Sequence, residues 1–187
     1  MKNIDIAFDI DGCVVNLMQQ LSRYLSAYAG AKIIDHNQFN FFTSPAISKK
    51  ELWQYIYNCY KDYKNTPVYP GARELFHNLY YLVRKPITFV TSRPVNAATQ
   101  TYKLMDTICI PPYTISFAKA PYHKRDFLHG FKYFMEDRRK TAFELANTGK
   151  IKIFIPQYSY NKIDVHKNII RISGIEDLNN IIYDLVS

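Results

Sequence analysis

Short apolar runs alternate along the chain with segments whose apolar residues recur at helical spacing. Four nearly continuous runs are typical of strands buried on both faces of a parallel sheet. These runs are residues 4–8, 87–90, 133–135 and 151–155, with weaker candidates at 114–117 and 168–172. Helical spacing is found over residues 72–83, 142–146 and 178–185. Strands that alternate with helices in this way predict an α/β fold with a doubly wound parallel sheet.

Turn and capping residues bound these helical segments. The Pro70-Gly71 turn precedes the first segment, and Gly149 suits a C-terminal stop for the second. Ser173 and Glu176 have the spacing of a capping box ahead of the last segment.

Residues 16–68 interrupt the alternation. Helical spacing runs from Leu17 to Tyr28 and stops near Gly30, and a second capping box, Ser48 and Glu51, opens another helical segment that reaches Tyr63. A Phe-rich loop at residues 39–42 joins them. About fifty residues are too many for a simple crossover between strands. We therefore predict a helical cap subdomain at 16–68, inserted into a catalytic core formed by 1–15 and 69–187.

The composition is that of a globular protein, with 187 residues, 48% of them hydrophobic and 21% charged. A formal net charge of +8 favours anionic partners, either phosphorylated metabolites or nucleic acid. The basic residues are scattered and form no run or tail, so a nucleic-acid partner is not favoured over a solvated basic surface.

The cysteines Cys13, Cys59 and Cys109 show no metal or redox spacing, which suits buried thiols in a reducing compartment. The sequence shows no signal peptide at its start, and no apolar stretch approaches the roughly 20 residues that span a bilayer. A cytoplasmic location without membrane association is therefore expected.

Asp9-Ile10-Asp11-Gly12 directly follows the first predicted strand. Two carboxylates this close repel each other, and a divalent cation relieves the repulsion; hard oxygen ligands suit Mg²⁺. The alternative is an Asp-rich turn in which glycine supplies a positive φ.

Thr91-Ser92-Arg93-Pro94 follows the second strong run, where hydroxyls and free backbone N–H groups can bind an anion. The competing interpretation is a helix N-cap with Pro94 at the first helical position.

Two further features follow later strand candidates. The ammonium of Lys124 could neutralise a phosphoryl group, although Lys119 competes for this role. Glu136-Asp137 follows the run at 133–135, where buried acids require a cation such as magnesium or Lys124. A helix N-cap by Asp137 is the alternative. Ligand sites of open α/β sheets lie at the carboxyl ends of strands, so the four features should meet there.

The ordered set of Asp9-Ile10-Asp11-Gly12, Thr91, Lys124 and Glu136-Asp137 resembles the four-motif signature of the haloacid dehalogenase superfamily, mostly phosphatases. The resemblance covers nearly the whole chain and implies a Rossmann-like core with a cap. The finer pattern is similar to the 5'(3')-deoxyribonucleotidase branch (type C 5'-nucleotidase-like proteins). That branch also has a helical insertion, a Pro-Gly-Ala turn, a basic residue after Glu-Asp, and a loop resembling residues 155–161.

By this resemblance, Asp9 attacks phosphorus and forms an aspartyl-phosphate, while Asp11 acts as acid and then base. The resemblance further implies that Mg²⁺ is held by the carboxylates of Asp9 and Asp137 and by the backbone carbonyl of Asp11. Glu136 replaces the Asp of many relatives, which leaves its contact with the metal open. Thr91, Ser92 and Lys124 are the implied phosphate ligands. Superfamily members that cleave carbon–halogen bonds lack an acid/base Asp at the position of Asp11, so its presence favours phosphoryl transfer.

The substrate is expected to be a small phosphorylated molecule, and the nucleotide follows mainly from the resemblance. The aromatic residues Phe41, Trp53 and Tyr57 of the cap could stack on a base, although packing between cap helices is the favoured explanation for each of them taken singly. A phosphatase for another phosphometabolite or for nucleic-acid 3' ends is an alternative. A protein that binds phosphate ligands without catalysis is an alternative of a different class.

Overall fold

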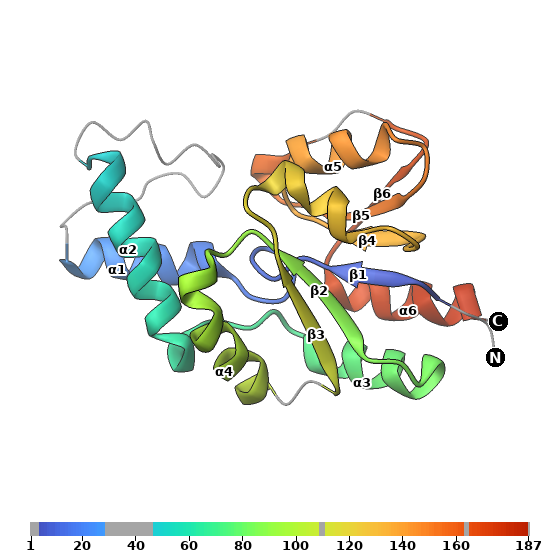
Figure 1. Cartoon of the computed structure of the whole chain (residues 1–187), viewed down its shortest axis with the longest axis horizontal. Helices are drawn as coiled ribbons and strands as arrows, with labels where there is room; N and C mark the ends of the chain where they lie inside the picture. Colours follow the sequence, from blue (N-terminus) through green and yellow to red (C-terminus); the bar gives the residue numbers. More distant parts are fainter. Residues whose placement is uncertain (1–3, 29–46, 109–110, 163–164, 187) are drawn as a thin grey trace.

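Six parallel strands of the described residues form one sheet at the centre of the molecule, in the order β3-β2-β1-β4-β5-β6 (Figure 1). The computed structural model describes residues 4–28, 47–108, 111–162 and 165–186. The strands are β1 (Ile6–Phe8), β2 (Ile87–Thr91), β3 (Tyr113–Phe117), β4 (Tyr133–Met135), β5 (Lys152–Pro156) and β6 (Ile169–Ile172). The predicted doubly wound parallel sheet is confirmed, including both weaker strand candidates.

Helices cover both faces of the sheet (Figure 1). They are α1 (Leu17–Tyr28), α2 (Lys49–Lys61), α3 (Ala72–Val83), α4 (Ala98–Ile108), α5 (Arg139–Ala146) and α6 (Ile175–Val186). Successive strand residues point to opposite faces, which divides the core in two. Ile6 and Phe8 belong to a buried cluster with α3, α4 and α6, whereas Ala7 belongs to a second cluster with α5. Continuous apolar strands are therefore required here, because each face of the sheet is covered.

The strand order places β1 beside both β2 and β4. The chain adds β2 and β3 on one side of β1 and then crosses to add β4, β5 and β6 on the other. A crevice forms outside the carboxyl ends of the strands where the winding direction reverses. The ends of β1 and β4 carry Asp9 and Glu136-Asp137, so the topology gathers these acids into one place.

The helices α1 and α2 pack on each other around their own apolar cluster, Leu21, Leu25, Leu52 and Cys59. The buried Gln20 amide donates to the carbonyls of Cys59 and Asp62 at 3.1 and 3.0 Å, which ties α1 to the end of α2. Val15 and Val68 pair in an isolated antiparallel bridge, so the two ends of the segment that contains α1 and α2 lie side by side. The division into core and cap subdomain stays a prediction.

Two local expectations need correction. Ser173 does not pair with Glu176: its backbone N–H and hydroxyl both donate to Asp177, at 2.8 and 2.7 Å, because α6 begins only at Ile175. The second helical segment ends at Lys61, and Tyr63 lies in the short 3-10 helix η2 (Tyr63–Asn65).

The capping box of Ser48 and Glu51 at the start of α2 is confirmed. Gly30, the loop at 39–42 with Phe41, and Cys109 lie outside the described residues. Within the described ranges, none of the helices has both the length and the apolar character that crossing a membrane requires.

Candidate active site

The loop after β1 holds its acids in a fixed geometry through backbone hydrogen bonds. Asp9 N–H donates to the Met135 carbonyl at 2.9 Å, which extends the pairing of β1 with β4 by one residue. The N–H groups of Val14 and Val15 both donate to the Ile10 carbonyl, at 2.8 and 3.1 Å. Gly12 turns the loop with φ at 77°, a conformation that favours glycine. An alanine Cβ there would overlap the Asp137 carboxyl group, so glycine also permits the close approach of the two loops.

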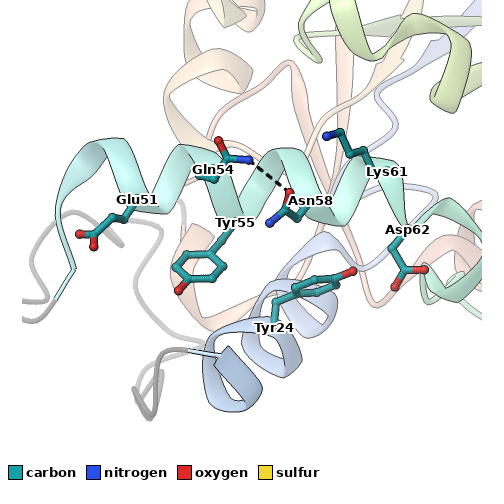
Figure 2. A pocket seen from close by; sticks show the side chains of 7 residues that line it. All are labelled: Tyr24, Glu51, Gln54, Tyr55, Asn58, Lys61 and Asp62. Atoms are coloured by element: carbon teal, nitrogen blue, oxygen red, sulfur yellow. Dashed lines mark hydrogen bonds between the residues drawn. The ribbon is translucent and has the colours of Figure 1, made fainter.

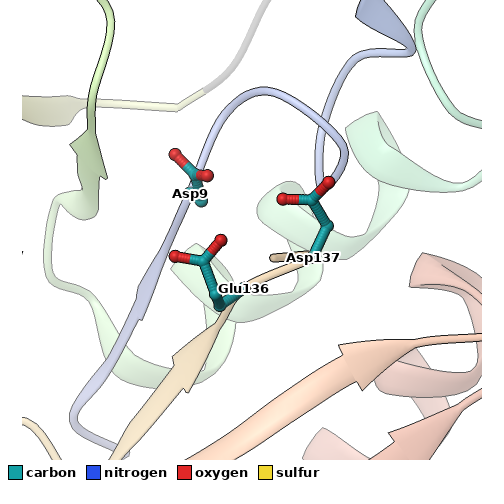
Figure 3. Close-up of side chains that lie close together, drawn as sticks. All are labelled: Asp9, Glu136 and Asp137. Carbon is teal, nitrogen blue, oxygen red and sulfur yellow. The ribbon is translucent and has the colours of Figure 1, made fainter. Parts of the chain in front are cut away.

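Three buried carboxyl groups, those of Asp9, Glu136 and Asp137, meet at the ends of β1 and β4 (Figure 3). One oxygen of each lies within 4.8 Å of the other two. Asp9 Oδ1 is buried and accepts no hydrogen bond from the described residues. Oxygen ligands of this kind and spacing can bind a hard divalent cation.

Lys124 is the lysine that reaches this cluster. It lies in the 3-10 helix η4 (Pro121–Phe127), and its Nζ is 2.6 Å from Asp9 Oδ2 and 2.8 Å from Glu136 Oε2. Lys124 is 2% exposed, whereas Lys119 lies at the surface. Glu136 has its second oxygen bonded to the Arg138 N–H at 3.0 Å, so protein donors occupy both of its oxygens.

The ionisation of the cluster reflects burial and crowding. Burial, together with the charges of Glu136 and Asp11, raises the pKa of Asp9 to about 7 against the opposing effect of Lys124. Burial and the neighbouring acids also raise the pKa of Asp137 well above its usual range. For Lys124 burial acts to lower the pKa, but the carboxylates of Asp9 and Glu136 outweigh it and raise the pKa, which keeps the ammonium charged. The site therefore holds more acid groups than its cations can balance, as a metal site requires.

Asp11 points to a different partner, the guanidinium of Arg93. Arg93 Nε lies 3.0 Å from Asp11 Oδ2, and Nη2 lies 2.7 Å from Oδ1, which is a bidentate ion pair. Arg93 is 2% exposed, and the ring of Tyr60 from α2 lies 4.7 Å from its guanidinium.

Thr91 and Ser92 lie between these groups at the end of β2. Thr91 is buried in the strand, and its Oγ1 accepts from the Arg93 N–H at 3.2 Å. Ser92 Oγ is buried and has no hydrogen-bond partner among the described residues. The N-cap interpretation is wrong: Pro94 precedes the 3-10 helix η3 (Val95–Ala97), and α4 starts only at Ala98 without a serine or threonine cap.

The loop after β5 holds Asp137 in place through hydrogen bonds. Tyr160 O–H donates to Asp137 Oδ2 at 2.7 Å, and Asn161 Nδ2 donates to the Asp137 carbonyl at 2.8 Å. Tyr158 O–H donates to the Gly12 carbonyl at 3.0 Å, so the same loop also holds the β1 loop. Asp137 is not a helix cap, because α5 begins at Arg139 and its N-cap residue is Arg138.

Two hollows flank α2. The larger, about 770 Å³, lies between α1 and α2 and is lined by polar side chains (Figure 2). None of the predicted site residues that lie within the described ranges lines it. The smaller, about 400 Å³, lies between α2 and the loop after β2 and is lined by Trp53, Tyr57, Tyr60, Pro94 and Asn96, among others. Trp53 is 51% exposed, which leaves much of its ring free to contact another molecule.

The structure thus brings together Asp9, Asp11, Thr91, Ser92, Lys124, Glu136 and Asp137, and places Trp53 and Tyr57 in the neighbouring groove. Sequence reasoning gave no role to Arg93 or to Tyr158, Tyr160 and Asn161. Arg93 carried a usable signal, since an arginine between Ser92 and Pro94 at a buried strand end needs an acid nearby. Tyr158 and Tyr160 carried no such signal in the sequence beyond their position after a predicted strand.

Comparisons with known proteins give relatives in structure only. The sequence matches no protein-family model and no curated protein. A haloacid dehalogenase-like hydrolase from Streptococcus pneumoniae is similar over 98% of this chain and 100% of its own, with a TM-score of 0.63 and 17% identity.

Two other solved structures are similar to this chain to about the same extent. A protein assigned as a phosphoglycolate phosphatase, from Lactobacillus delbrueckii, is similar over 97% of this chain and 99% of its own, with a TM-score of 0.62 and 14% identity. A protein assigned as a haloacid dehalogenase hydrolase, from Bacillus subtilis and bound to magnesium, is similar over 98% and 100%, with a TM-score of 0.61 and 11% identity. The chain therefore has the haloacid dehalogenase-like fold.

Proposed function

We propose that this protein is a magnesium-dependent phosphomonoester hydrolase that works through an aspartyl-phosphate on Asp9. The observation that carries the proposal is Asp9 itself. One of its oxygens is fixed 2.6 Å from Lys124, and the other is buried without a hydrogen-bond partner among the described residues. A buried carboxylate oxygen kept free of donors is a costly arrangement unless it binds a cation or attacks a substrate.

In the first step Asp9 forms a bond to phosphorus while the ester P–O bond breaks, and Asp11 gives a proton to the departing alkoxide. In the second step water attacks phosphorus, the bond to Asp9 breaks, and Asp11 takes a proton from the water. Inorganic phosphate and an alcohol are the products, and both aspartates regain their starting state.

Asp9, Asp137 and the Asp11 carbonyl would hold Mg²⁺, and the donor set of hard oxygens fits this ion. When bound, the cation offsets the repulsion between the carboxylate nucleophile and the dianionic phosphate. Glu136 would not need to touch the metal, because its two oxygens already bind Lys124 and the Arg138 N–H. Its role would be to hold Lys124 against Asp9.

The phosphoryl oxygens would be bound by Lys124, Ser92 and Thr91. The Ser92 hydroxyl is buried without a partner, and the Thr91 hydroxyl still has its proton to donate because its oxygen only accepts from Arg93 N–H.

We further propose that residues 16–68 act as the cap and that the substrate is a nucleoside monophosphate, as in the 5'(3')-deoxyribonucleotidase branch. Support comes from the groove of about 400 Å³ beside the site, where Trp53 and Tyr57 could stack on a base. Another small phosphometabolite is the second candidate, because a fold relative is assigned as a phosphatase of phosphoglycolate.

A phosphate-release panel with Mg²⁺ tests both levels of the proposal. The panel holds 5' and 3' nucleotides in deoxy and ribo form, a 3'-phosphorylated oligonucleotide and sugar phosphates, with Asp9→Asn as the inactive control. Release from deoxynucleoside monophosphates is expected. Phosphate release from the oligonucleotide or sugar phosphates alone overturns the nucleotidase assignment. Release from none of the substrates overturns the proposal that the protein is a phosphatase.

A further inference from the structure

We propose that Arg93 is a positioning residue that fixes the Asp11 carboxylate for proton transfer, and that Tyr60 of α2 holds the guanidinium in place. The inference rests on the proposed function, since it assigns Arg93 a part in the same reaction.

The ion pair has the geometry needed to orient a carboxylate. Two parallel contacts, of 3.0 and 2.7 Å, join Arg93 to the two oxygens of Asp11. A single contact would let the carboxylate rotate, whereas a bidentate fork fixes its plane. The Asp11 side chain is 22% exposed while that of Arg93 is 1% exposed, so the guanidinium supports Asp11 from the protein side. Each carboxylate oxygen keeps a second lone pair for the proton that it must exchange.

The position of Arg93 is itself determined by three separate parts of the fold. Its backbone N–H donates to Thr91 Oγ1 at the end of β2, and its Nη1 donates to Thr101 Oγ1 of α4 at 3.4 Å. The ring of Tyr60, which is 7% exposed, lies 4.7 Å from the guanidinium. Tyr60 belongs to α2, so the helix that we assign to the cap contributes to the orientation of Asp11.

These contacts distinguish Arg93 from a phosphate ligand. The donors Nε, Nη1 and Nη2 bind Asp11 and Thr101, and the phosphate ligands proposed above are other residues. For an alkyl phosphate, loss of Arg93 should therefore lower kcat with little change in KM. The size of the loss in kcat/KM, which reports the first step, should depend on how much the leaving group needs a proton.

The experiment compares an alkyl phosphate, whose alkoxide must be protonated as it leaves, with p-nitrophenyl phosphate, whose phenolate leaves without a proton. For Arg93→Met we expect kcat/KM, which reports the steps up to loss of the alcohol, to fall about 10- to 100-fold on the alkyl phosphate and less than about threefold on the aryl phosphate. The value of kcat also contains the hydrolysis of the aspartyl-phosphate, in which Asp11 acts as base for either ester, so it does not distinguish the two substrates. Arg93→Lys keeps the charge without the fork, so it should recover only part of the loss. Tyr60→Leu should show the same dependence on the leaving group in weaker form.

A double-mutant cycle links the effect to Asp11. In an Asp11→Asn background, Arg93→Met should change kcat by less than about twofold, because there is no acid left to position. Arg73→Met is the matched control: Arg73 also donates through Nε, but to the Ile108 carbonyl at the end of α4. Urea unfolding of each variant shows whether it is folded.

Equal losses of kcat/KM on both substrates, a large loss that persists in the Asp11→Asn background, or a rise in KM with unchanged kcat on the alkyl phosphate would each overturn the positioning role. These results all leave hydrolysis by the unaltered protein intact. Failure of the unaltered protein to hydrolyse either ester is a separate result, and it overturns the proposed function together with this inference.

Discussion

Replacing Gly12 by alanine places a methyl group where the Asp137 carboxyl now lies. The added Cβ would overlap Asp137 Oδ2 and Cγ and would lie 2.8 Å from Asp137 Cβ, whereas ordinary van der Waals contact begins at 3.4 Å. Asp137 must therefore move by about 1 Å, and a displacement of that size at a reacting centre can lower a rate about 10²-fold. The shift also breaks the hydrogen bond from Tyr160 that orients Asp137.

Gly12→Ala should therefore weaken Mg²⁺ binding about 10- to 100-fold, the range typical of lost support around a metal ligand. Phosphate release at a fixed Mg²⁺ concentration should fall by about 100-fold. The positive φ of 77° adds about 1–2 kcal/mol of backbone strain, which urea unfolding measures. Metal affinity is measured by calorimetric titration of the full chain.

Gly149→Ala separates the clash from the strain. Gly149 has a φ of 72°, and among the described residues no atom beyond its two chain neighbours lies within 4 Å of the Cβ that alanine would add. This control should lose similar stability and keep both Mg²⁺ affinity and activity. The reasoning is refuted if Gly12→Ala binds Mg²⁺ as the unaltered protein does, or if the control loses activity to the same extent.

Two further predictions concern the charges of the site. Lys124→Met leaves Asp9 and Glu136 without their buried cation. We therefore expect activity to be lost and the free energy of unfolding at neutral pH, measured with urea, to fall by about 3–5 kcal/mol. Lys119→Met is the exposed control, and equal effects of the two changes would exclude Lys124 as the lysine of the site. The pKa of Asp9 is about 7 in the folded protein, above its ordinary value of 3.8, so the metal-free protein becomes less stable as pH rises from about 4 to 7. Mg²⁺ binds the ionised carboxylate of Asp9, so calorimetric titrations should show about tenfold tighter Mg²⁺ binding at pH 8 than at pH 6. Equal affinities, or tighter binding at pH 6, would contradict the assignment of Asp9 as a metal ligand with a raised pKa.

Local patterns were sufficient to predict the strands and the gathering of acidic residues at strand ends. The strands β1, β2, β4 and β5 are largely apolar runs buried on both faces. Asp9, Thr91 and Glu136 lie at or just after strand ends, which the parallel topology brings to one edge of the sheet. The capping box at Ser173 was misassigned because Glu176 and Asp177 are adjacent, and a one-residue shift in the helix start decides between them.

Contacts that depend on distant segments could not be predicted. Arg93 and Asp11 are 82 residues apart, and their pairing depends on the placement of the β2 loop against the β1 loop. Tyr160 reaches Asp137 only because β5 lies next to β4 and η5 (Ser159–Asn161) turns its ring back over the strand ends. The choice between Lys119 and Lys124 likewise depends on how η4 winds, which the sequence pattern does not specify.

The stereochemical course at phosphorus tests the central claim about Asp9 most directly. A phosphorothioate ester, made chiral at phosphorus by its sulfur and two oxygen isotopes, is hydrolysed by the full chain in water carrying the third oxygen isotope. Attack by Asp9 followed by attack of water consists of two in-line displacements, so the account predicts retention of configuration in the inorganic thiophosphate. Inversion would show a single direct attack by water and would contradict the aspartyl-phosphate.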